Sequence, residues 1–76
     1  MKSETLDYVL DSIMGIMESL MLEEHYKLFK EQHPEFDWTL PDFEDTIRTF
    51  SHNKNTKEFM IESMVEFIKE NKLEDY

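Results

Sequence analysis

The three histidines are the first residues to consider for metal binding or acid–base chemistry. They are His25, His33 and His52, and none lies three or four positions from another. Two imidazoles on one helix face need that spacing to share a metal ion. The chain also has no cysteine, so it offers no thiolate ligand. We therefore predict no metal site, and we expect His25 to lie at the edge of the core.

Carboxylates are abundant, but their spacing does not favour catalysis. Glu23 and Glu24 are adjacent and would point to different sides of a helix, and Glu44 and Asp45 repeat this arrangement. A general acid and a general base must instead converge on one substrate. EF-hand and phosphate-binding loops need glycines at set positions, whereas Gly15 is the only glycine. We predict that the protein is not an enzyme and has no catalytic or cofactor-binding residues.

The charge balance indicates which partners the chain would attract. Eighteen Asp and Glu residues against eight Lys and Arg residues give a formal net charge of −10. Such a chain repels nucleic acid and anionic membranes at long range and attracts basic proteins. The plainer interpretation is that the charge serves solubility alone. No apolar stretch is long enough to cross a bilayer, so we expect a cytoplasmic protein that binds neither membranes nor nucleic acid directly.

The stretch from residue 6 to residue 21 is the element around which the other residues must be organised. Its apolar residues recur at the spacing of one helix face, which predicts a helix over about residues 4–21. They are Leu6, Val9, Leu10, Ile13, Ile16, Met17, Leu20 and Met21. The opposite side has no basic residue and carries four acids, which are Glu4, Asp7, Asp11 and Glu18.

Gly15 lies on this acidic side of the predicted helix. A glycine inside a helix costs about 0.5–1 kcal/mol relative to alanine. One interpretation is that another surface packs closely against the backbone there. The other, which we favour, is a tolerated surface glycine or a mild bend.

A second helix is predicted after a break near residue 22. The next apolar stripe is rotated from the first and consists of Leu22, His25, Tyr26 and Phe29. One long helix would have two apolar faces, so a break is favoured over continuity. Glu23 and Glu24 suit a first helical turn, and Pro34 ends the segment, which predicts a helix over about residues 23–32.

Two further helices follow from capping signals and apolar spacing. Thr39 is a candidate N-cap for a helix over about residues 40–51, with Pro41 in its first turn. Asn55 is a candidate N-cap for a helix over about residues 56–72. The fold class predicted is therefore all-α, a small bundle of about four helices.

Residues 1–76 are expected to form one helical domain, in which residues 73–76 fray. The six methionines either fill irregular gaps in the core or line an adaptable binding surface, and we favour gap filling. The predicted core consists of Leu10, Ile13, Met17, Leu20, Phe29, Phe43, Ile47, Phe50, Met64 and Phe67.

The connector over residues 34–40 carries large apolar groups at alternate positions. Phe36, Trp38 and Leu40 alternate with polar residues, yet no second strand is available to pair with them. We expect an extended connector pinned to the core, in which Trp38 anchors the fold rather than serving as a platform for a ligand.

The leading functional hypothesis is a protein-interaction module, a regulator or an adaptor. The predicted helices have more apolar surface than so small a core can cover, and a partner would cover the surplus. The energetic centre is placed on one face of the last helix, formed by Met60, Ile61, Met64 and Ile68. Steering of a protein partner with a basic rim is assigned to Glu4, Asp7, Asp11 and Glu18.

Two alternatives are retained. The first is a small acidic inhibitor that occupies a basic site on its target, as a DNA mimic, an immunity protein or a phage-encoded host inhibitor would. Such binding should weaken steeply with salt, whereas binding through apolar faces should not. The second is a structural subunit that forms a homodimer, in which a second copy covers the surplus apolar surface.

Overall fold

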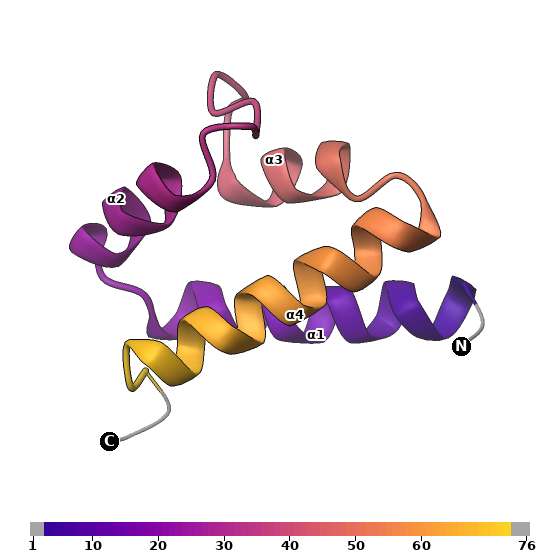
Figure 1. Ribbon diagram of the computed structural model, residues 1–76, viewed down its shortest axis with the longest axis horizontal. Coiled ribbons are helices and arrows are strands. Elements are labelled where there is room, and N and C mark those ends of the chain that lie inside the picture. Colours follow the sequence, from indigo (N-terminus) through magenta and orange to yellow (C-terminus); the bar gives the residue numbers. More distant parts are fainter. Residues whose placement is uncertain (1–2, 74–76) are drawn as a thin grey trace.

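The computed structural model describes residues 3–73, and these residues form an all-α bundle without strands. The helices are α1 (Ser3–Leu20), α2 (Glu23–Gln32), α3 (Phe43–Phe50) and α4 (Lys54–Glu70). α1 and α4 are in closest contact and run in the same direction, while α2, α3 and their connector lie above them in Figure 1. The predicted fold class is confirmed.

The core lies between α1 and α4 and under α2 and α3. The buried residues of α1 and the residue after it recur every three or four positions and are Leu6, Leu10, Met14, Met17 and Met21. Those of α4 are Met60, Met64, Phe67 and Ile68. All methionines that the structure describes are buried, which agrees with gap filling.

The predicted core is confirmed for six of its residues, which are Leu10, Met17, Phe29, Ile47, Met64 and Phe67. The remaining residues are half-buried and pack against the core, and they are Ile13, Leu20, Phe43 and Phe50. Three of these are the first or last residue of a helix, namely Leu20, Phe43 and Phe50.

The chain breaks between α1 and α2, as predicted. Leu22 has an extended backbone, and its N–H donates to Nδ1 of His25 at 2.9 Å. His25 therefore caps α2 from inside the first turn, because its ring satisfies a backbone donor that no helical carbonyl can reach. The bounds of α2 agree with the prediction.

The start of α3 differs from the prediction. Asp42, not Thr39, is the N-cap, and its Oδ1 accepts the N–H of Asp45 at 2.8 Å. Thr39 instead donates both its N–H and its hydroxyl to Oδ1 of Asp37 in a turn of the connector. Because this turn uses Thr39, α3 begins three residues later, at Phe43.

α4 also begins and ends earlier than predicted. Asn53, not Asn55, is its N-cap, and its Oδ1 accepts the N–H of Thr56 at 3.0 Å. At the other end Lys72 has a positive φ of 54°, and the N–H of Leu73 donates to the carbonyl of Ile68. This C-terminal motif holds Leu73 in the core, so fraying is wrong for Leu73. Residues 74–76 lie outside the described residues.

Phe29 is fully buried and is the centre of an aromatic cluster. Its ring centroid lies 5.1 Å from that of Phe67, 5.7 Å from that of Phe43 and 6.1 Å from that of Trp38, mostly edge to face. Phe36 is also buried and stacks on His33. The cluster thus joins α2, the connector, α3 and α4 through ring contacts of the favoured geometry.

Trp38 fixes the connector to this cluster. Its Nε1–H donates to the carbonyl of His33 at 2.8 Å, and its ring packs on Phe29, Phe36 and Phe43. These contacts agree with the anchor role predicted for it. The ring is only half-buried, however, so part of it remains open to solvent.

Two substitutions separate the contributions of Trp38. Trp38→Ala removes the ring and the donor and should lower the free energy of unfolding by about 3 kcal/mol. Trp38→Phe keeps a ring but leaves the His33 carbonyl without its donor, and should lower it by about 1 kcal/mol. Urea unfolding followed by circular dichroism measures both values. Parent-like stability of Trp38→Ala would show that the ring does not anchor the connector.

Gly15 is exposed, and a Cβ built on it meets no atom within 4 Å. This is the tolerated surface glycine that we favoured. Gly15→Ala should therefore raise the free energy of unfolding by about 0.5–1 kcal/mol, because alanine loses less backbone entropy in a helix. The same unfolding experiment tests this value. A loss of stability would instead indicate that the isolated chain packs another surface against Gly15.

Candidate functional site

The apolar face predicted on the last helix is mostly covered. Met60 and Met64 are fully buried and Ile68 is 8% exposed. Of the predicted apolar residues, only Ile61 retains substantial exposed surface. The apolar residues of α4 span a wide arc of the helix, and α1 covers the part that holds the two methionines. The part left for a partner is the flank that begins at Ile61.

Two of the acids predicted for steering form ion pairs with residues of other helices. Asp7 of α1 lies 2.7 Å from the ammonium of Lys57 on α4. Asp11 lies 2.9 Å from the guanidinium of Arg48 on α3, which also pairs with Glu44 at 2.8 Å. These half-exposed pairs contribute about 0–1 kcal/mol each, so their main effect is on helix register and local charge.

The other two acids, Glu4 and Glu18, lie at opposite ends of the acidic side. Glu4 is exposed in the first turn of α1. Glu18 faces the start of α3, where burial and the neighbouring carboxylates of Glu44 and Asp42 raise its pKa, while Arg48 opposes them. Of the predicted acidic face, Asp7 and Asp11 are thus paired with basic groups, Glu4 is exposed, and Glu18 lies beside other carboxylates.

A groove follows α4, and at one end it is bordered by Leu6 and Val9 on the opposite flank of α1. One hollow of about 350 Å³ is lined by Leu6, Val9, Glu58, Ile61 and Glu62. A second hollow of about 420 Å³ continues it along α4 and is lined by Ile61, Glu62, Val65, Glu66, Lys69 and Glu70. The two share Ile61 and Glu62, so they form one surface. We call it the α1–α4 groove.

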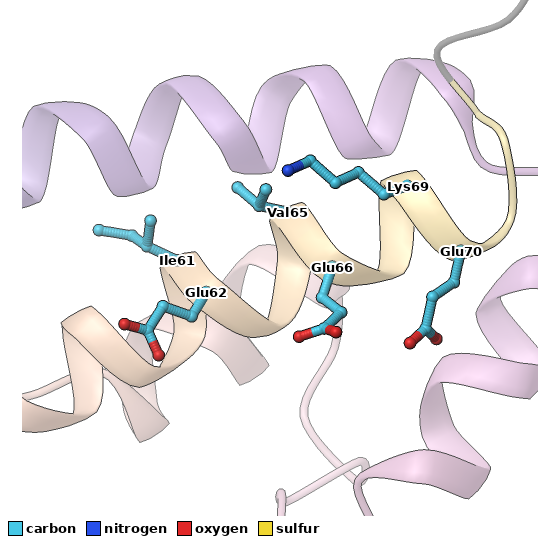
Figure 2. Close-up of a pocket in the computed structure, with 6 residues that line it drawn as sticks. All are labelled: Ile61, Glu62, Val65, Glu66, Lys69 and Glu70. Carbon is cyan, nitrogen blue, oxygen red and sulfur yellow. The ribbon is translucent and has the colours of Figure 1, made fainter.

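The floor of the α1–α4 groove is apolar. Val9, Ile61 and Val65 are half-buried, and Figure 2 shows Ile61 and Val65 on the same side of α4 as the stem of Lys69. Ile13 and Ile16 follow Val9 by four and seven positions and so lie on the same side of α1. Ile16 is 52% exposed, which extends the apolar strip beyond the two hollows.

The rim of the groove on α4 is acidic. Its carboxylates recur every four residues, are all exposed and belong to Glu58, Glu62, Glu66 and Glu70. Figure 2 shows the last three projecting from one side of the helix. Within residues 3–73 none of the four forms an ion pair. Like charges at this spacing destabilise a helix by a few tenths of a kcal/mol per pair.

The four-residue spacing of this row is visible in the sequence, but the acids predicted for steering were those of α1. The sequence does not show that two of these, Asp7 and Asp11, are paired with Lys and Arg residues distant in the chain.

A third hollow, separate from the α1–α4 groove and different in chemistry, lies where the connector meets α1, α2 and α3. It has a volume of about 300 Å³ and is lined by Glu18, Tyr26, Lys30, Trp38, Leu40, Pro41, Asp42, Phe43 and Thr46. Its three aromatic residues are half-buried, and each comes from a different element. We call it the aromatic hollow. Burial and the charge of Glu18 raise the pKa of Tyr26.

The environment of Glu18 predicts a pH-dependent gain on its neutralisation. Its raised pKa means that the folded state disfavours the ionised form, so ionised Glu18 destabilises the fold at neutral pH. Glu18→Gln should raise the melting temperature at about pH 7, and the gain should vanish as the pH falls through the pKa of Glu18. Calorimetry across this range provides the measurement. A gain in melting temperature that does not change with pH would show that the charge of Glu18 is not its cause.

Comparison with protein-family models, curated protein sequences and solved structures finds no match to this chain. Over the described residues, no helix is long and apolar enough to span a membrane. Over the same residues, no three His, Asp or Glu side chains gather in an arrangement that could hold a metal ion. The function must therefore be inferred from the α1–α4 groove and the aromatic hollow.

Proposed function

We propose that this protein is a small acidic interaction module, a regulator or an adaptor, that binds a protein partner through the α1–α4 groove. The observation that carries the proposal is the combination of an open apolar floor with a row of four carboxylates on the same helix, none of which forms an ion pair within residues 3–73. The row costs the isolated chain some stability through like-charge repulsion. Lys or Arg residues of a basic partner would pair with these carboxylates and so relieve the repulsion between them.

The partner segment that fits this surface is an amphipathic helix. A helix laid in a groove presents apolar anchors at i, i+3, i+4 and i+7, which can fill the floor beside Val9, Ile61 and Val65. Lys or Arg residues four positions apart along its edge would then meet Glu58, Glu62 and Glu66, whose spacing is the same. The groove thus specifies both the apolar stripe and the position of the charges.

The two parts of the groove have different tasks. Buried apolar anchors carry most of the energy of protein interfaces, whereas rim charges mainly accelerate association and exclude wrong partners. Ile61 is therefore assigned to affinity, and Glu62 and Glu66 to steering. Of the predicted apolar face, Ile61 is retained as a binding residue. The steering role passes from the acids of α1 to those of α4.

The alternative of a small acidic inhibitor that mimics a polyanion is favoured by the regular carboxylate row alone. Such an inhibitor would use Glu58, Glu62, Glu66 and Glu70 in place of phosphates. The apolar floor beside the row has no counterpart in a phosphate backbone, which is why we rank this function second. A homodimer through the groove is disfavoured, because it would bring two acidic rims together.

Substitutions on the floor and on the rim should act differently on binding of a partner isolated from the native host. Ile61→Asp should weaken binding by more than about tenfold, because it places a charge at an apolar anchor. Glu62→Lys with Glu66→Lys should instead slow association by roughly tenfold and flatten its dependence on salt. Surface plasmon resonance at several salt concentrations separates the two effects.

Glu24→Lys with Glu31→Lys is the matched control, because it makes the same charge change at exposed positions of α2. It should leave the association rate closer to that of the parent than the rim variant does. Circular dichroism must show that each variant is folded. If the rim variant abolishes binding while a folded Ile61→Asp variant binds normally, mimicry of a polyanion is the better account.

A further inference from the structure

We infer that the aromatic hollow binds an alkylammonium group, of the kind carried by choline or by a trimethylated lysine side chain. Its walls are the rings of Tyr26, Trp38 and Phe43, so Trp38 would serve as a platform for a ligand in addition to the anchor role predicted for it. The rings of Trp38 and Phe43 are nearly parallel, at 22°, while the ring of Tyr26 stands at 80° to that of Phe43. Tyr26 packs edge to face on Phe43, with ring centroids 5.4 Å apart, so the three rings form one continuous aromatic lining. A cation placed over the face of such a ring is attracted by the quadrupole of the ring.

Carboxylates supply the complementary charge. Glu18 and Asp42 line the aromatic hollow beside the rings, and the charge of Glu44 is also felt at Glu18. The nearest guanidinium, that of Arg48, is already shared between Asp11 and Glu44. The hollow therefore has an excess of negative charge, which a bound cation would offset.

The chain itself places an ammonium group on one wall. Nζ of Lys30 lies 5.8 Å from the centroid of the Trp38 ring, within the range of a cation–π contact. Lys30 is exposed, so its flexible side chain can leave the ring at little cost. We interpret it as an internal competitor for the same interaction.

Size and composition narrow the class of ligand. A volume of about 300 Å³ is at the lower limit for small-molecule sites, so the aromatic hollow suits one headgroup or one side chain. Leu40 and Pro41 add apolar lining that suits methyl groups and offers no side-chain ligand to a metal ion. The carboxylates disfavour anions, and they give a cation an advantage over a neutral molecule of the same shape.

Trp38 is the only tryptophan in the chain, so its fluorescence reports directly on this wall. Titration with choline should change the fluorescence saturably. Its neutral carbon isostere, 3,3-dimethylbutan-1-ol, should bind at least about tenfold more weakly. Absence of a saturable change with choline, or equal affinity for the two molecules, would overturn the inference.

Variants of the charged residues test the same site without removing a ring. Glu18→Gln with Asp42→Asn should weaken choline binding by about tenfold, while the asparagine can still accept the N–H of Asp45 and cap α3. Lys30→Gln should strengthen binding severalfold by removing the competitor. Glu24→Gln with Glu31→Gln removes two charges from exposed positions of α2 that do not line the aromatic hollow, and should leave choline binding unchanged. If the first pair binds choline like the parent, the inference fails.

Two peptides distinguish the sources of the ligand group. A peptide with trimethylated lysine that binds more tightly than choline would assign the aromatic hollow to a protein side chain. Affinity no better than that of choline would assign it to a free headgroup. A peptide with unmodified lysine should bind more weakly than the trimethylated one, and equal affinity would overturn the assignment to an alkylammonium group. The aromatic hollow shares no residue with the α1–α4 groove, so either proposal can fail alone.

Discussion

The packing of Phe29 is the interaction on which the rest of this structure depends. Its ring is fully buried and contacts Phe67 of α4, Phe43 of α3 and Trp38 of the connector. α2 and α3 are short, and helices of this length have little stability in isolation. They are held against α1 and α4 because one large ring joins all the segments that follow the first helix. The position of Trp38, and with it the aromatic hollow, follows from this packing.

The pairing of α1 with α4 determines which surfaces remain open. Met60 and Met64 fill the space between the helices, and the ion pairs Asp7–Lys57 and Asp11–Arg48 lie along one flank of α1. The other flank of α1 is apolar and is covered only in part by α4. A small domain has too few elements to cover both flanks of its longest helix. The α1–α4 groove is the result.

The α1–α4 groove and the aromatic hollow differ in the kind of ligand they suit. The groove is long, open and bordered by a periodic row of carboxylates, which suits an extended helical segment. The hollow is small and lined by three aromatic rings and two carboxylates, which suits a single cationic group. Both favour positive charge, in agreement with the net charge of −10.

The four helices, the break near residue 22 and the bounds of α2 could be predicted from the sequence. These features depend on residues a few positions apart, through apolar spacing and local capping. Even here a local competitor changed the start of α3, because Thr39 bonds to Asp37 instead of capping the helix. Only the packing of the helices shows that Ile61 stays half-exposed beside the buried Met60 and Met64, and that Asp7 and Asp11 have basic partners. It also brought Tyr26, Trp38 and Phe43 around one space. Each of these depends on how helices distant in sequence cross and pack, which local spacing does not specify.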